Sequence, residues 1–241
     1  MTRARPGTGR ALVEAAVLVA LYLAGELARG LARGDDAAAE RHAEAIASLE
    51  RHLHVFGEAA VQRAAGHVPA LSTVLGYAYV SLHLAATVAV LVWVYRRHGH
   101  AYPAVRTTFA LATALAVVGY ALYPTAPPRL AGLGIGDTVS HVTAVDLDSG
   151  FVSSLYNPYA AFPSMHVGFA VLIAGTVWRL GARTVWRVAA LLYPVAILFV
   201  IVATGNHFFV DAVAGGAVAA LAAGATLALR AGVRLPVPTE A

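Results

Sequence analysis

The sequence of 241 residues contains no cysteine and no lysine, and all 17 of its basic residues are arginine. The absence of cysteine excludes disulfide bonds and thiolate chemistry, although it does not identify the compartment. The reliance on arginine, alanine, valine and glycine is typical of a GC-rich genome. The net charge of +4 is therefore weak evidence for a nucleic-acid partner, and we expect none.

Charged residues of either sign are scarce. They make up 12% of the chain, whereas 59% of the residues are hydrophobic, and a soluble domain carries about twice that share of charge. The hydrophobic residues lie in long blocks rather than in the short periodic runs of a soluble core. This pattern indicates an integral membrane protein.

Six segments approach the about 20 mostly apolar residues that cross a bilayer. The first is the weakest, because Glu14 and Glu26 bracket a short uncharged core and because the preceding arginines give it the look of a signal peptide. No clear cleavage site follows it, so we interpret it as an uncleaved helix. The expected spans are 11–29, 70–95, 103–123, 165–180, 185–203 and 210–230.

The positions of the arginines orient these spans. Eleven of them precede the first span, follow the sixth, or lie in the short connections between the second and third spans and between the fourth and fifth. All eleven therefore fall on one side of the membrane. By the positive-inside rule that side is cytoplasmic. We expect a bacterial plasma-membrane protein with both termini in the cytoplasm. The eleven are Arg3, Arg5, Arg10, Arg96, Arg97, Arg106, Arg179, Arg183, Arg187, Arg230 and Arg234.

The first outer loop carries an amphipathic pattern, in which apolar residues recur at intervals of three and four as on one face of a helix. Such a helix either lies along the bilayer surface or packs on the bundle, and the pattern alone leaves both open. Asp35 or Asp36 is placed to cap its start. The stripe consists of Ile46, Leu49, Leu53, Phe56 and Ala60.

The expected fold is all-α: one polytopic membrane domain over residues 1–241, with six transmembrane helices and an extra interfacial helix in the first outer loop. The tail at 231–241 is expected to be disordered. Three polar stretches lie at helix ends on the outer side of this bundle, and their convergence is the strongest functional signal in the sequence. They are "PTAPPRL" at 124–130, "FPSMH" at 162–166 and "TGNHFFVD" at 204–211.

The third stretch places His207 and Asp211 four residues apart, on one face of a helix. The carboxylate can fix the tautomer of the imidazole and leave its other nitrogen free as a nucleophile or base. A satisfied polar pair at a helix end is the plainer interpretation. An ionisable pair that faces a membrane interior is costly, which favours function.

The other two stretches suit a phosphate. Ser164 is a natural N-cap and His166 falls in the first helical turn, where free N–H groups favour an anion. Arg129, beside Pro127 and Pro128, can grip phosphate oxygens with two parallel hydrogen bonds. Taken singly, these features are also those of a capped helix and a solvated arginine.

The ordered set "PPR", "NPYAAFPSMH" and "GNHFFVD" resembles the inositolphosphotransferase branch of the type 2 phosphatidic acid phosphatase superfamily, to which fungal inositol phosphorylceramide synthase belongs. The resemblance runs from about "LERHLHVFGEAAVQ" to "DAVAGG". It implies a six-helix bundle and a phosphohistidine mechanism that requires no metal and no other cofactor.

The resemblance also implies a role for each matched residue. His207 would be the nucleophile on phosphorus and Asp211 would orient it. His166 would protonate the leaving oxygen and later act as the base. Arg129 and Ser164 would hold the phosphate.

Three departures favour the inositolphosphotransferase branch over a generic phosphatase. Leu122 and Ile201 stand where the broader superfamily has a lysine and an arginine, and Met165 replaces a glycine. Fewer cations are then left to hold the phosphate. Candidate donors and substrate-cavity residues are Tyr123, Asn157, Asn206 and His83, the last of which is alternatively a structural histidine within a span.

We therefore expect a membrane-embedded phosphotransferase that acts on lipid phosphoesters. The alternative is a lipid phosphate phosphatase that uses water as the acceptor, since the same residues serve both reactions. Two other classes are a proton-coupled transporter and a metal site built from His166, His207 and Asp211. The expected partners are a membrane lipid substrate and the bilayer; the sequence leaves the acceptor and the oligomeric state open.

Overall fold

The computed structural model describes residues 8–31, 35–143 and 157–232. Within these residues the regular structure is helical, and one isolated bridge joins Thr125 to Ala160. The long helices are α1 (Thr8–Leu31), α4 (Leu71–Arg97), α5 (Tyr102–Leu122), α8 (Met165–Leu180), α9 (Thr184–Ala203) and α10 (Phe209–Gly232). The short ones are α2 (Asp36–His52), α3 (Glu58–Gly66), the 3-10 turn η1 (Pro128–Leu130) and α6 (Thr138–Val142).

All six expected apolar segments are helices, with bounds within three residues of those predicted. Five of them, namely α1, α4, α5, α9 and α10, are long and apolar enough to cross a membrane. Helix α8 has 16 residues and a length of about 24 Å, which is less than the about 30 Å of a bilayer core. The chain is therefore an integral membrane protein, and its count of six spans stays a prediction.

Helix α8 lies at the centre of the bundle. One end of it joins a core cluster with α4, α9 and α10 that includes Tyr79, Val167, Ile197 and Ala212. Its middle joins a second cluster with α4, α5 and α10 that includes Phe109 and Ile173. Because α8 contacts four neighbours, its first turn is held on all sides by other helices.

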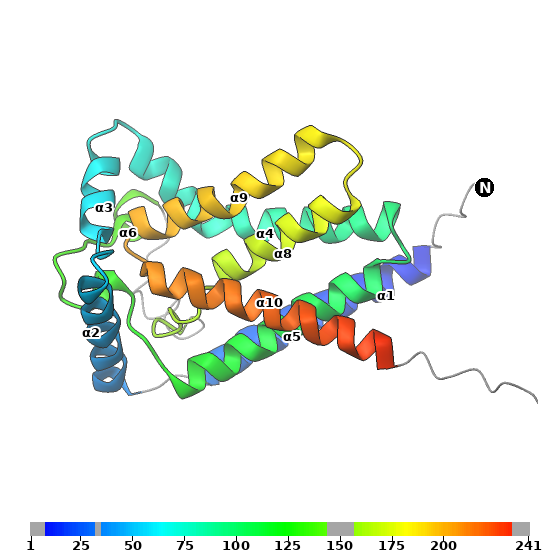
Figure 1. The fold of residues 1–241 in the computed structure, drawn as a ribbon, viewed down its shortest axis with the longest axis horizontal. Coiled ribbons are helices and arrows are strands. Elements are labelled where there is room, and N and C mark those ends of the chain that lie inside the picture. Colours follow the sequence, from blue (N-terminus) through cyan, green and yellow to red (C-terminus); the bar gives the residue numbers. More distant parts are fainter. Residues whose placement is uncertain (1–7, 32–34, 144–156, 233–241) are drawn as a thin grey trace, which may run out of the picture.

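Helix α1 lies at the edge of the bundle and packs on α5. An ion pair between Glu14 of α1 and Arg106 of α5 joins the two helices. Glu14 made this span look weak in the sequence, and the pairing with Arg106 explains how its charge is accommodated. Figure 1 shows α2, α3 and α6 gathered at one end of the long helices, while the turn between α8 and α9 lies toward the other end.

The prediction of one helix in the first outer loop is wrong. Helix α2 ends at His52 and α3 begins at Glu58, with His54 at a positive φ of 58° in the turn between them. The predicted stripe is also misplaced, because Leu49 and Leu53 are 46% and 55% exposed. The buried side of α2 consists of Ala39, Ala43, Ile46, Ala47 and Glu50.

This side of α2 packs against protein. Ala39, Ala43 and Ile46 form a cluster with Ala126 and Phe208, so α2 covers the first and third of the polar stretches. The prediction of a capping residue is confirmed, because the side chain of Asp35 accepts a hydrogen bond from the backbone N–H of Ala38 at 3.2 Å.

The predicted tail begins two residues too early. Helix α10 continues through Ala231 and Gly232. The remainder of the tail, residues 233–241, lies outside the described residues.

Candidate active site

The three polar stretches contact one another at the end of the bundle that α2 and α3 cover. The backbone N–H of Arg129 donates to the carbonyl of Gly205 at 3.0 Å, and that of Ser164 donates to the carbonyl of Asp211 at 3.0 Å. The ring of His207 adds a bond to the carbonyl of Ala161, also at 3.0 Å. The stretch at 204–211 is therefore the centre that holds the other two.

His207 and Asp211 form a buried pair. Oδ2 of Asp211 lies 3.3 Å from Nδ1 of His207 and accepts a second bond from the backbone N–H of Phe208 at 2.9 Å. His207 is 4% exposed and Asp211 0%. The carboxylate thus fixes both the imidazole and the backbone just before α10.

The surroundings of Nδ1 determine the tautomer of His207. Its two neighbours are a backbone carbonyl, that of Ala161, and the carboxyl oxygen of Asp211. A carbonyl can only accept, so Nδ1 carries the proton. Nε2 then keeps its lone pair, which is the state that a nucleophilic histidine needs.

His166 lies beside His207, in the first turn of α8. The two rings are 5.6 Å apart between centroids and meet edge to face. Nε2 of His166 lies 3.2 Å from the carbonyl of Tyr79, so it carries a proton, and the ring stacks on that of Tyr79 at 4.5 Å. Nδ1 is the ring nitrogen of His166 left to move a proton.

Ser164 brings an unused hydroxyl to this place. The side chain is fully buried, and its Oγ has no hydrogen-bond partner among the described residues. It precedes the first turn of α8, where the helix N–H groups have no intrahelical acceptor. A buried donor next to such a turn is suited to an anion.

A close approach between α8 and α10 holds Ser164 against α10, the helix that carries Asp211. A Cβ atom added at Gly215 would lie 2.0 Å from the backbone oxygen of Ser164. A Cβ atom at Gly168 would lie 3.0 Å from the backbone oxygen of Gly215. The close contact between α8 and α10 is therefore made at Gly215, whereas Gly216 faces open space.

Arg129 is buried and bound on two sides. Its Nε donates to Oδ1 of Asn206 at 3.2 Å, and one terminal nitrogen forms an ion pair with Asp137 at 3.0 Å. Gly205, whose φ is +75°, provides the turn that leads into Asn206. Asp137, which was not predicted as a site residue, fixes the guanidinium of Arg129 beside Asn206, the residue that precedes His207.

The remaining predicted residues divide into two groups. His83 belongs with the site, since its ring lies 4.2 Å from that of His166 and its Nδ1 is buried without a partner among the described residues. Asn206 is used by Arg129 and by the backbone of Thr204.

Asn157 and Tyr123 serve other contacts. The amide of Asn157 binds the backbone of Arg29 and of Tyr159. The ring of Tyr123 stacks on His42 at 3.9 Å. Among the described contacts, neither residue touches His83, His166 or His207.

Leu122 and Ile201 supply no positive charge, as expected. A different cation lies near His83 and His166. Arg29, at the end of α1, lies within electrostatic range of both His83 and His166. Its guanidinium also lies 5.9 Å from the centre of the Tyr120 ring. No sequence signal indicates this position, because it depends on how α1 packs on the bundle.

Two buried carboxyl groups at the start of α10 were also not predicted. Glu50 of α2 accepts a bond from the backbone N–H of Val210 at 2.7 Å, and Glu58 of α3 accepts from that of Phe209 at 3.2 Å. Burial raises the pKa of Glu50 to about 9, with hydrogen bonding and repulsion from Glu58 as further causes. Glu50 is therefore neutral at pH 7 and anchors the helix that carries Asp211.

Acidic side chains at a helix start also satisfy its free N–H groups. Together α2 and α3 cap the start of α10, so the segment between α1 and α4 positions the His207–Asp211 pair. Among the residues that the structure describes, no three His, Asp or Glu side chains converge closely enough to hold a metal ion.

A family model described as the PAP2 superfamily matches residues 44–225, which is more than half of the 241 residues. The chain belongs to the PAP2 superfamily. Comparisons with curated proteins and with solved structures gave no significant match. Membership indicates a membrane enzyme of the lipid phosphatase or phosphotransferase type, and the inositolphosphotransferase branch stays a prediction.

Proposed function

We propose that this PAP2 superfamily member is a membrane-embedded phosphotransferase that moves a phosphoryl-containing head group from a lipid phosphoester to an alcohol, through a phosphohistidine at His207. The observation that carries the proposal is the tautomer of His207. Its Nδ1 faces two acceptors, Ala161 and Asp211, and its Nε2 is left free beside His166.

The first step uses the lone pair of His207 Nε2. This atom attacks phosphorus, and the bond between phosphorus and the lipid oxygen breaks, with its electron pair passing to that oxygen. His166, protonated on both nitrogens, gives the proton on Nδ1 to the leaving oxygen. The proton on Nε2 stays on that nitrogen and is hydrogen-bonded to the carbonyl of Tyr79. The cationic phosphohistidine is stabilised by the carboxylate of Asp211.

The second step reverses these roles. Nδ1 of His166 takes the proton of the acceptor hydroxyl, whose oxygen attacks phosphorus. The phosphorus–nitrogen bond breaks and its electron pair returns to His207 Nε2. The enzyme is then ready for another donor lipid.

The phosphate oxygens are assigned to donors that converge on this place. They are the unpartnered hydroxyl of Ser164, the first-turn N–H groups of α8 and the guanidinium of Arg129, held by Asn206 and Asp137. Arg29, near His83 and His166, supplies a further positive charge. These donors need little reorganisation when charge develops on phosphorus.

Burial of the site favours an alcohol over water as acceptor. His207, Asp211 and Ser164 are almost completely enclosed, and Met165 packs against Ala116, Tyr120 and Ala160 beside them. Exclusion of water protects a phosphohistidine from hydrolysis. The match to the inositolphosphotransferase branch at Met165 leads to the same expectation.

The proposed arrangement in the membrane follows the arginines. All six long helices, including the shorter α8, cross the bilayer as one domain, with both termini in the cytoplasm and the site on the outer face. Helices α2 and α3 then lie at the outer interface, where the exposed Leu49, Leu53 and Val55 contact lipid.

Product analysis with a phospholipid labelled in its head group tests transfer against hydrolysis. The purified protein is supplied with phosphatidylinositol, with and without a ceramide acceptor. We expect labelled transfer product only when the acceptor is present, and no product with His207→Ala. Release of the labelled head group at the same rate with every acceptor would instead identify a phosphatase.

A further inference from the structure

A groove lies at the end of α8 that is remote from His166 and His207. It has a volume of about 830 Å³ and lies between the last turns of α4 and α8 and the first turn of α9. His166 and Leu180 are separated by 14 residues of α8, or about 21 Å at the helical rise of about 1.5 Å per residue. The groove is therefore separate from the proposed catalytic site.

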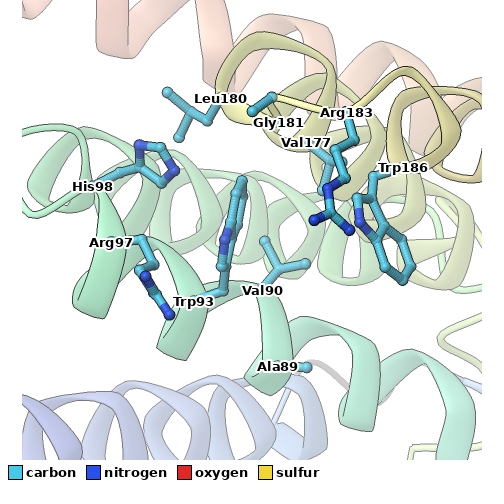
Figure 2. A pocket seen from close by; sticks show the side chains of 11 residues that line it. Ala89, Val90, Trp93, Arg97, His98, Val177, Leu180, Gly181, Arg183 and Trp186 are labelled. Atoms are coloured by element: carbon cyan, nitrogen blue, oxygen red, sulfur yellow. The ribbon is translucent and has the colours of Figure 1, made fainter.

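The lining of the groove divides by chemistry. Ala89, Val90, Val177 and Leu180 make an apolar floor, and Trp93 and Trp186 stand on its two sides. In Figure 2 the guanidinium of Arg183 lies between these two indole rings, and Arg97 and His98 lie at the end of α4. An apolar slot bordered by tryptophan and arginine is typical of the membrane interface.

The two arginines have no acidic partner within the described chain. Neither Arg97 nor Arg183 forms an ion pair or a side-chain hydrogen bond there, in contrast to Arg106 and Arg129. Arg96, Arg179, Arg187 and Arg230 add positive charge at the same end of the bundle. Within the described residues both guanidinium groups are therefore available to bind an anion.

We propose that this groove binds an anionic phospholipid, with its phosphate between Arg97 and Arg183 and an acyl chain along the floor formed by Val90, Val177 and Leu180. The volume lies in the range of about 300–1,000 Å³ that is usual for small-molecule sites. The bound lipid fills the gap between α4 and the α8–α9 turn. It is a structural ligand, since the reacting histidines lie at the other end of α8.

The chain carries its own reporter for this site. It has three tryptophans: Trp93 and Trp186 line the groove and Trp178 is exposed in the last part of α8. Tryptophan fluorescence therefore reports on this end of the molecule alone, and lipid bound near His207 does not contribute. Trp178→Phe removes the one indole that does not line the groove.

The test is quenching of the Trp178→Phe protein by brominated lipid in vesicles that mix phosphatidylglycerol with phosphatidylcholine. We expect brominated phosphatidylglycerol to quench more strongly than the same fraction of brominated phosphatidylcholine. The relative binding constant should favour phosphatidylglycerol by at least about fivefold, the effect of one arginine at an interface.

Matched variants separate the groove from the general surface charge. Arg97→Gln with Arg183→Gln should reduce the preference to about one, while Arg96→Gln with Arg179→Gln, which removes equal charge just outside the groove, should keep most of it. His207→Ala should leave quenching unchanged, so this proposal and the proposed function fail separately. Equal quenching by both lipids, or no quenching because protein fills the groove, would overturn the proposal.

Discussion

The polar side chains at the two ends of α8 differ in their surroundings. At its start, His166, Ser164 and the neighbouring His207 are enclosed by protein, and Nε2 of His166 and Nδ1 of His207 have fixed partners within it. At its end, Arg97 and Arg183 border an apolar groove and have no acidic partner among the described residues. One end is organised for chemistry with internal partners, and the other is arranged to take a partner from the membrane.

Loss of His166 should have the largest effect at the enclosed end. With His166→Gln, we expect the rate of transfer from a natural lipid donor to fall by about 10²- to 10⁴-fold, because the leaving oxygen receives no proton. The measurement is kcat with phosphatidylinositol as donor.

The first turnover of a nitrophenyl phosphoester provides the control for His166→Gln. Its leaving oxygen needs no proton, so the burst of nitrophenol should be reduced much less than turnover of the lipid. An equal loss with both substrates would show that the variant has damaged the site rather than removed an acid.

Gly215→Ala should have the next largest effect, because a Cβ there would lie 2.0 Å from the backbone oxygen of Ser164. We expect a loss of about 1–3 kcal/mol in the free energy of unfolding, as for overpacking in a core, together with lower activity. Gly216→Ala is the matched control, since nothing lies near that position. Equal stability of the two variants in a thermal or denaturant melt would contradict the proposed contact.

Glu50 gives an effect that depends on pH. Its pKa of about 9 lies above the ordinary value of 4.5, so the folded protein keeps a proton that the unfolded chain releases. This contribution to stability is complete below about pH 4.5 and is lost as the pH rises toward about 9. Glu50→Gln should therefore flatten the decline of the melting temperature over this range.

Glu44→Gln is the control for Glu50→Gln. Glu44 lies on the same helix, and its ion pair with Arg51 is exposed to solvent, so its removal should change stability by at most about 1 kcal/mol. If the Glu50→Gln and wild-type proteins show the same pH profile, Glu50 does not anchor α10 through its proton.

The sequence predicted most of this architecture because long apolar runs leave few alternatives. The six long helices were predicted within three residues of their bounds, and the cap at Asp35 was readable from local pattern. The first outer loop was misread because α2 buries mostly alanine and Glu50, whereas Leu49 and Leu53 are exposed. An apolar stripe does not identify the side of a helix that packs against protein where lipid can solvate exposed leucines.

The site was predicted in its local pairs and missed in its long-range partners. The pair of His207 and Asp211 was predicted from helical spacing, although His207 lies two residues before α10 begins, and Ser164 with His166 was predicted from a helix start. The contacts of Arg129 with Asn206 and of Glu50 with Val210, and the position of Arg29 near His83 and His166, depend on packing between distant segments. A single sequence carries no signal for such contacts.

The most direct test of the account is to trap the covalent intermediate. In a single turnover with head-group-labelled phosphatidylinositol and no acceptor, rapidly quenched in alkali, peptide mass spectrometry should find the labelled head group on His207. The adduct should be released by acid, as expected for a phosphorus–nitrogen bond, and should be absent from His207→Ala. Turnover without a label on His207, or a label that persists in His207→Ala, would contradict the proposed mechanism.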